Sequence, residues 1–417
     1  MKVTVGTVFV SFGVLLAQTP EAWRLAVADH KWEQAEPLLL QSLQQAESAA
    51  ALRALATVYR VTGRLAAADP LLERVVNLEE TVAGVEDWAG VKTALGQSDR
   101  AEALYRRSLE LRRQSGENAR ESISTLQRLA GVLALQSKFD QAVQEATRAI
   151  SLRAVPGGPQ PPELASDLAV LARLYQSQEK YQLALATWEG VVDVQEAAFG
   201  VEDLRLSSTL ASIAELHRRL EDLPAAEQAL RRAIAISEVN RGVSNAEVAR
   251  TLDQLGEILF AQKRYADAEP VYQRSLAIWT ALLGPTDSML ALNYDNLAVT
   301  EASLENYHEA ERLYLEALKF RDFDDINSLR NLAVARAAQK RYSAAEPLYR
   351  RATAMLDEPQ NRQPEAWAAT LTDYADLLRK LNRAAEAARM EERIRRQPVR
   401  AVPAKVDAQP AAGRQVK

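Results

Sequence analysis

The segment KRYADAEPVYQRSL (residues 263–276) decides the fold, because altered copies of it recur along most of the chain. Its Ala268 serves as a marker for the repeat. The equivalent positions, here called the marker alanines, are Ala35, Ala68, Ala101, Ala142, Ala184, Ala226, Ala268, Ala310, Ala345 and Ala387. Five of the nine intervals are 42 residues, and the others are 33, 33, 41 and 35. Such self-similarity predicts stacked repeat units rather than one closed core.

A second small residue lies twelve positions before nine of the marker alanines. These crossing residues are Ala56, Ala89, Ala130, Ala172, Ala214, Gly256, Ala298, Ala333 and Ala375. Around Gly256, the apolar residues Leu252, Leu255 and Leu259 have helical spacing, and a turn is expected at residues 262–264. Two antiparallel helices approach closely only where one presents a methyl group or a hydrogen. Each unit is therefore predicted to be a helical hairpin.

Four prolines lie two residues after marker alanines, inside apolar helical patterns. They are Pro37, Pro70, Pro270 and Pro347. The first N–H groups of a helix have no internal partner, so proline costs little there. We therefore expect these prolines in the first turn of the second helix of each hairpin.

With these residues in register, the chain resembles the tetratricopeptide repeat family. That family's signature is a Leu-Gly or Leu-Ala pair followed by Ala-x-x-x-Tyr or Ala-x-x-x-Phe, as in Leu255-Gly256 and Ala268-x-x-x-Tyr272. The 42-residue units, with LLGPTDSMLALNYDNLA (residues 282–298) between them, resemble the kinesin light chain subtype. The resemblance implies an all-α, right-handed α-α superhelix of about ten hairpins, whose first helices line a concave groove. It also implies binding of an extended segment or helix of a partner protein.

The two ends of the chain differ from the repeats. Residues 1–17, MKVTVGTVFVSFGVLLA, have one Lys, an apolar stretch and a small residue at Ala17, which is typical of a cleaved secretory signal. An uncleaved membrane anchor is the alternative, although the apolar stretch is short for one. We expect repeats over residues 18–394, a disordered basic tail over 395–417, and a periplasmic or secreted location without membrane insertion once the signal is removed.

The charge of the repeats argues against a nucleic-acid partner. The formal net charge is −5, but the tail from residue 395 holds six basic residues and one acidic residue, and Lys2 adds another positive charge. Residues 18–394 therefore carry −11, whereas nucleic-acid binding normally needs a basic stripe.

Few residues suggest chemistry. There is no Cys, the three His residues are far apart in sequence, and no phosphate-binding loop or nucleophile motif occurs. No cofactor, metal site or enzymatic activity is expected. The carboxylates are scattered over repeat positions, where a solvated helix face explains them.

The repeat register predicts which side chains face the groove. The candidate binding residues are Arg128, Arg173, Arg219, Arg250, Gln254, Glu257, Asn296, Asn327, Arg330 and Asn331. In the kinesin light chain type, an Asn two positions before the crossing residue holds a ligand's backbone amide, and Asn296 and Asn331 match that position. The arginines favour an acidic peptide or a free C-terminus as ligand, because guanidinium pairs with carboxylate in a fork geometry. The alternative is that they only solvate the groove or pair with neighbouring acids.

The sequence thus predicts a non-catalytic protein- or peptide-binding scaffold. Two other functions stay open at this point. One is a structural or self-associating envelope protein, and the other is a hydrolase of an envelope polymer. The sequence identifies neither the partner nor the oligomeric state.

Overall fold

The computed structural model describes residues 23–321, 325–358, 361 and 363–396. Among these residues the regular structure is helical, and no β-strand occurs. The all-α prediction is confirmed. The predicted signal at residues 1–17 lies outside the described residues, and so does the predicted tail from residue 397 on. The first two residues of that predicted tail, Arg395 and Arg396, are helical rather than disordered.

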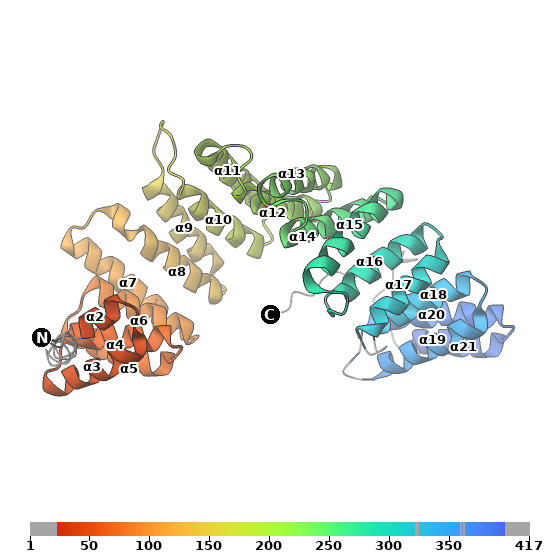
Figure 1. Ribbon diagram of the computed structural model, residues 1–417, viewed down its shortest axis with the longest axis horizontal. Helices are drawn as coiled ribbons and strands as arrows, with labels where there is room; N and C mark the ends of the chain where they lie inside the picture. Colours follow the sequence, from red (N-terminus) through yellow and green to blue (C-terminus); the bar gives the residue numbers. More distant parts are fainter. Residues whose placement is uncertain (1–22, 322–324, 359–360, 362, 397–417) are drawn as a thin grey trace, which may run out of the picture. The chain divides into compact units, whose positions relative to one another are not determined.

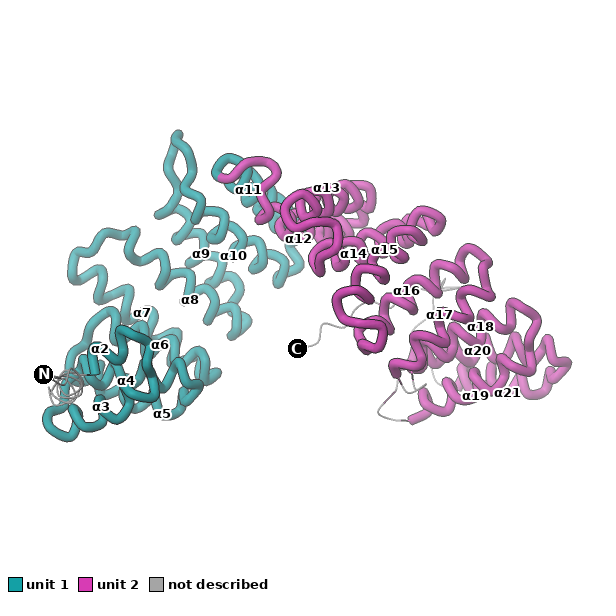
Figure 2. The backbone as a smooth tube through the Cα atoms, viewed as in Figure 1, with its two compact units in different colours: residues 1–198 teal, residues 199–417 magenta. Residues whose placement is uncertain are grey.

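The chain divides into two compact units, residues 1–198 and residues 199–417 (Figure 2). The first unit contains a short 3-10 helix and ten described α-helices, the last of which ends one residue into the second unit. They are α2 (Trp23–Ala28), α3 (Trp32–Gln45), α4 (Ala49–Val61), α5 (Leu65–Leu78), α6 (Val82–Ala94), α7 (Ser98–Ser115), η1 (Ala119–Ser122), α8 (Ile123–Leu135), α9 (Phe139–Arg153), α10 (Leu164–Ser177) and α11 (Tyr181–Phe199).

The second unit contains ten further described helices. They are α12 (Arg205–Arg219), α13 (Leu223–Arg241), α14 (Ala246–Ala261), α15 (Tyr265–Leu283), α16 (Leu290–Ser303), α17 (Tyr307–Lys319), α18 (Ile326–Ala338), α19 (Tyr342–Asp357), α20 (Pro364–Lys380) and α21 (Ala384–Arg396). In both units each even-numbered helix is the first helix of a hairpin and the following odd-numbered helix is the second (Figure 1). The second helix of one hairpin packs against the first helix of the next, as α13 does against α14 and α15 against α16.

The predicted crossing points lie in the core of each hairpin. All ten marker alanines are buried, with 0% or 1% of their surface exposed. The nine crossing residues are buried as well. Because these positions carry at most a methyl group, the two helices of each hairpin can pack closely there. The repeat register read from the sequence is confirmed.

Each hairpin turns at the residue five positions before its marker alanine. This residue always has a left-handed backbone, with φ between +57° and +77°. Glycine fills the position only in the second and third hairpins, as Gly63 and Gly96. The other eight turn residues are His30, Ser137, Glu179, Glu221, Lys263, Glu305, Lys340 and Asn382. A left-handed conformation costs a residue with a Cβ roughly 1–2 kcal/mol, so eight turns hold local strain.

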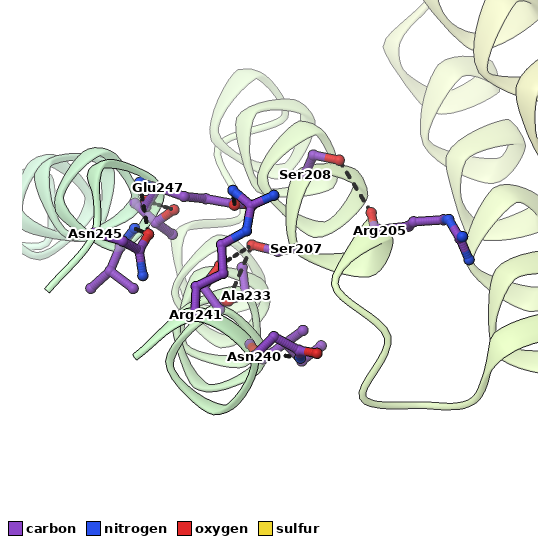
Figure 3. Close-up of polar contacts among 12 residues, drawn as sticks. Arg205, Ser207, Ser208, Ala233, Asn240, Arg241, Asn245 and Glu247 are labelled. Atoms are coloured by element: carbon purple, nitrogen blue, oxygen red, sulfur yellow. Dashed lines mark hydrogen bonds and ion pairs between the residues drawn. The ribbon is translucent and has the colours of Figure 1, made fainter. Parts of the chain in front are cut away.

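The connection between α13 and α14 shows how one hairpin leads into the next (Figure 3). Gly242 ends α13 with φ +79°. Asn245 Oδ1 accepts hydrogen bonds of 3.0 Å from the N–H groups of Glu247 and Val248, and so caps the first turn of α14. Its Nδ2 donates to the Gly242 carbonyl at 2.7 Å. One side chain thus fixes both the end of α13 and the start of α14.

The expected position of the four prolines was wrong by one turn. Pro37, Pro70, Pro270 and Pro347 are each the sixth residue of their helix, in α3, α5, α15 and α19. A proline there frees the carbonyl four residues earlier, which becomes costly if it is buried. All four prolines are exposed, and so are the residues whose carbonyls they free, so water can satisfy those carbonyls. The second helices therefore begin earlier than the prolines suggest.

Candidate functional site

The ten predicted binding residues all lie on first helices. In the first unit Arg128 is on α8 and Arg173 on α10; in the second unit the others lie on α12, α14, α16 and α18. Arg128, Arg173, Arg219, Arg250 and Asn327 are exposed, and Gln254, Glu257, Arg330 and Asn331 are half-buried. The structure thus brings eight of the ten onto one unit, with three of them on α14 and three on α18.

Asn296 was expected to be exposed, but only 1% of its surface is accessible. Both flanking first helices bind the same stretch of α16. Asn293 Nδ2 donates to Asp253 Oδ1 on α14 at 2.9 Å, and Asp295 Oδ1 accepts from Ser328 Oγ on α18 at 2.8 Å. With α16 held on both sides, Asn296 is covered. Its Oδ1 nevertheless forms no hydrogen bond with any described residue.

Hydrogen bonds between consecutive first helices were missed by the sequence reasoning. In each case the residue three positions before the crossing residue of one first helix is hydrogen-bonded to the residue five positions before the crossing residue of the following first helix. These first-helix pairs are Glu86–Thr125, Gln127–Asp167, Asp253–Asn293 and Asp295–Ser328. The partners are 33 to 40 residues apart in sequence. Polar residues recurring at these two register positions are the signal that could have revealed the pairs.

Burial perturbs the aspartate carboxyl groups of these pairs. It raises the pKa of Asp295 to about 6, although the charge of Arg321 acts in the opposite direction. Burial likewise raises the pKa values of Asp167 and Asp253 above their ordinary range. The Asp253 carboxylate accepts from three donors, the Ser275 hydroxyl, Trp279 Nε1 and Asn293 Nδ2. These acids are structural acceptors whose hydrogen-bonding capacity is already used.

Two of the predicted arginines are bound to acids of the same surface. Arg219 Nε donates to Glu215 Oε1 at 2.7 Å, and Arg218 binds both oxygens of that carboxylate at 2.6 Å. Arg330 Nε donates to Asp373 Oδ2 on α20, also at 2.7 Å. In the second unit these arginines therefore follow the alternative reading of pairing with neighbouring acids.

Arg128 and Arg173 differ, because neither forms an ion pair with a residue in the described part of the chain. Arg128 on α8 interacts with the Tyr105 hydroxyl, while the exposed side chain of Arg173 on α10 has no such partner within the described ranges. The first-helix surface of the first unit thus presents positive charge that described acids do not neutralise.

On the second unit, Glu257 is an acidic residue without a hydrogen-bond donor, whereas Arg128 and Arg173 are basic residues without an ion-pair partner among the described residues. Its half-buried carboxylate forms no hydrogen bond with a described residue, and burial raises its pKa to about 7. The charge of Arg218 lowers this pKa, whereas Asp253 and Glu215 raise it. A carboxylate left without donors is poised to accept them from a ligand.

Neither a metal cluster nor a membrane span is found in the described ranges. There, no three His, Cys, Asp or Glu side chains come together in a way that could hold an ion. No helix within those ranges combines the length and apolar character needed to cross a bilayer.

Comparison with known proteins agrees with the fold. The family model described as tetratricopeptide repeat matches residues 81–154, 164–238 and 247–322, which is more than half of the chain. The C-terminal part of a TPR repeat-containing protein from Cytophaga hutchinsonii has a similar structure, with a TM-score of 0.51 and 11% identity over 66% of this chain and 99% of that one.

Two further solved structures are similar at lower TM-scores. BtubC (BKLC) from P. vanneervenii has a TM-score of 0.46 and 20% identity, covering 54% of this chain and 89% of its own. A putative kinesin light chain with nearly identical TPR-like repeats, from Podosopora anserina, has a TM-score of 0.43 and 16% identity, covering 48% and 96%. No curated protein sequence matches this chain. The family match and the buried repeat register together show that the chain belongs to the tetratricopeptide repeat family.

Proposed function

We propose that this protein is a non-catalytic scaffold that binds a segment of a partner protein on the exposed surface of its first helices. Tetratricopeptide repeats generally mediate protein–protein interaction, which supports the class of function. The observation that carries the proposal is a set of polar side chains on first helices that make no hydrogen bond with other described residues. They are Arg173, Gln254, Glu257, Asn327 and Asn331.

These side chains suit recognition rather than stabilisation of the fold. Polar groups that only stabilise the fold are usually bonded inside the protein, as the first-helix pairs are. Gln254 and Asn331 each offer an amide that can donate and accept, which matches the backbone of an extended peptide. Arg128 and Arg173 supply positive charge on the first unit, and an acidic stretch of the partner would complement them.

We also propose that the protein acts outside the cytoplasm. The apolar run after Lys2 and the small residue at Ala17 support export. Cell fractionation of the full-length chain tests this part. We expect the protein in the periplasmic or extracellular fraction with residues 1–17 removed, as shown by N-terminal sequencing. Retention in the cytoplasm with an intact N-terminus would contradict export.

Selection from a random library of linear twelve-residue peptides tests the binding function. We expect the purified protein to enrich a set of related peptides that bind in a 1:1 ratio by calorimetry. Two double variants are tested, Arg128→Glu/Arg173→Glu on the first unit and Gln254→Ala/Asn331→Ala on the second. At least one of them should weaken binding of the peptide at least tenfold.

The matched control is Arg148→Glu on the second helix α9, where the native arginine is exposed and lies 3.8 Å from Glu145. It should leave the affinity unchanged. Enrichment of no peptide, or equal losses in the control and the first-helix variants, would contradict a peptide-binding surface on the first helices. Concentration-dependent light scattering without peptide binding would favour the self-associating role instead.

A further inference from the structure

Three successive connections between hairpins of the second unit expose large apolar side chains. We define them by their residues as the first (199–205), second (239–247) and third (282–289) connections. Their exposed apolar residues, here called the connection patch, are Phe199, Val201, Val239, Val243, Leu282 and Met289. Between 39% and 71% of each residue's surface is accessible. Single exposed apolar side chains are common, but a pair at each of three successive connections requires an explanation.

Hydrogen bonds hold the first connection against the second. The Val201 carbonyl accepts a hydrogen bond of 3.3 Å from Arg232 Nη2 on α13. The Glu202 carbonyl accepts one of 2.8 Å from Asn240 Nδ2, which lies at the end of the same helix. Val239 precedes Asn240 in sequence, so the first connection lies beside the part of the second that carries Val239.

The second connection lies against α15 in the same way. Arg274 on α15 donates to the Val243 carbonyl at 3.5 Å and forms an ion pair with Glu238. Leu282, near the end of α15, follows Asn240 by 42 residues, which is one repeat. It therefore has the place on the second connection that Asn240 has on the first. The six side chains of the patch thus belong to neighbouring segments of one surface.

The spacing of the patch distinguishes between kinds of partner. Packed helices lie about 8–10 Å apart, so successive connections cannot be closer than that. An extended peptide presents side chains to one face about every 7 Å, and it would lose register with the patch after one connection. A second copy of this chain carries the same three connections at the same spacing. Its apolar pairs can therefore meet all three pairs of the patch.

Charges on the second connection favour an antiparallel arrangement of the two copies. Arg241 Nη1 lies 3.1 Å from Glu247 Oε2, and Figure 3 shows the two side chains next to each other. A twofold axis through the second connection would set Arg241 of one copy against the partner's Glu247, so that opposite charges meet. The first connection of each copy would then face the third connection of the other.

We infer that two copies of this chain associate through the connection patch in a twofold, antiparallel dimer. The three connections contain 24 residues, which is within the 20–30 residues that each partner contributes to an interface of standard size. Closing the interface removes the patches of both copies from water, which is the main driving force of association. None of the ten candidate binding residues lies in these connections, so the inference goes beyond the proposed function.

Sedimentation equilibrium tests whether the patch causes association. The chain from residue 18 is used, because it contains every described residue but not the apolar residues 1–17. We expect a monomer–dimer equilibrium whose dimer fraction rises with protein concentration. Val239→Glu/Val243→Glu places charges in the apolar contact and should raise the dissociation constant at least tenfold. Both native side chains are exposed, so the variant should fold.

The matched control is Leu135→Glu/Leu183→Glu on the first unit. These leucines are also exposed, at 68% and 51%, but they lie outside the connection patch. The control should dimerise like the native protein. A native protein that stays monomeric at every concentration would overturn the inference, and so would equal losses of dimer in the patch variant and the control.

Cysteine cross-linking tests the geometry, because the chain contains no Cys of its own. A short bifunctional thiol reagent should join two copies of Val243→Cys, which lies beside the predicted axis. Val201→Cys and Met289→Cys should each fail to cross-link alone but should cross-link when the two variants are mixed. Efficient cross-linking of Val201→Cys to itself would show a parallel arrangement and contradict the antiparallel dimer.

Further outcomes identify other occupants of the patch. If the native protein is monomeric and Val239→Glu/Val243→Glu abolishes its binding of library-selected peptides, the patch belongs to the peptide site and the dimer is excluded. If the monomer instead sediments with phosphatidylcholine vesicles and this variant does not, the patch binds a lipid surface. Failure of peptide selection alone would overturn the proposed function and leave the dimer standing.

Discussion

The ring of Tyr272 packs against the backbone of Gly256 so closely that no side chain fits between them. A Cβ at position 256 would lie 2.5 Å from two ring carbons, which is far inside van der Waals contact. Eight of the nine crossing residues are alanine, so this hairpin is exceptional in using a hydrogen. The contact fixes the depth at which Tyr272 is inserted between α14 and α15.

Gly256→Ala should therefore destabilise the protein, although alanine favours helices. The added methyl displaces a buried ring, and overpacking of this kind costs about 1–3 kcal/mol. Urea unfolding followed by circular dichroism measures the change. Gly131→Ala on α8 is the matched control, because no atom lies within 4 Å of its new Cβ. It should stabilise by about 0.5–1 kcal/mol. Similar effects at both positions would contradict the packing account.

Replacing a larger residue by glycine at a left-handed hairpin-turn position should increase the stability of the protein. Glu179 has φ +57°, and Glu179→Gly removes that strain at the cost of greater chain entropy in the unfolded state. We expect a gain of up to about 1 kcal/mol in the free energy of unfolding.

The reverse change is Gly63→Ala at φ +77°, where a new Cβ meets no atom within 4 Å. Its expected loss of about 1 kcal/mol would then arise from the backbone alone. Thermal melts of both variants provide the measurement. A loss of stability in Glu179→Gly would show that the turns are not strained.

Asp295 should make stability fall as pH rises from about 4 to about 6. Its pKa in the folded state is about 6, raised by burial, whereas an unfolded aspartate has a pKa of about 3.9. A raised folded pKa means that the unfolded state ionises first, so the contribution of this group is present below pH 4 and is lost by pH 6.

Asp295→Asn removes this titration. The stability of the variant relative to the native protein should improve by about 2–3 kcal/mol between pH 4 and pH 6.5. Urea unfolding at the two pH values measures it, with the exposed Asp376→Asn as control, whose relative stability should change less. A difference that stays constant with pH would mean that Asp295 titrates alike in both states.

The ion pair between Arg330 and Asp373 should couple the last hairpin to the one before it. Arg330 Nε and Nη2 each lie 2.7 Å from Asp373 Oδ2, and both side chains are largely covered. A double-mutant cycle with Arg330→Ala and Asp373→Ala should give a coupling free energy of about 1 kcal/mol. Hydrogen exchange in α20 and α21 should accelerate in each single variant. Additive effects of the two substitutions would exclude the coupling.

Much of the fold could be predicted from the sequence, because its main determinant is local and repeated. The ten marker alanines and the nine crossing residues mark the positions where the two helices of a hairpin are in contact. These contacts lie within one hairpin, so the sequence of that hairpin is enough to predict them. The proline positions were misjudged because solvent can satisfy a carbonyl freed in the second turn of an exposed helix. The outward-facing surface of α3, α5, α15 and α19 decided this, and sequence periodicity does not report it.

The candidate site was predicted less completely. The register placed all ten residues on first helices, yet it could not show that Asn296 is enclosed. That enclosure depends on Asp253 and Ser328, which lie 43 and 32 residues away in sequence. The pairing of Arg219 and Arg330 with acids is likewise a property of three-dimensional neighbours. The expectation that Glu257 faces the candidate surface agrees with its partial exposure, but its lack of donors became visible only in the structure.

The first-helix pairs also make the 42-residue unit exchangeable. If residues 254–295 were excised, Asp253 would take the position of Asp295, and Ser328 would still be available to donate to it. Unequal recombination at this spacing can therefore shorten the array here while the new junction keeps a complementary pair of polar groups. Insertions or deletions of other lengths would place side chains that cannot hydrogen-bond opposite one another. The array can therefore gain or lose complete 42-residue units more easily than parts of a unit.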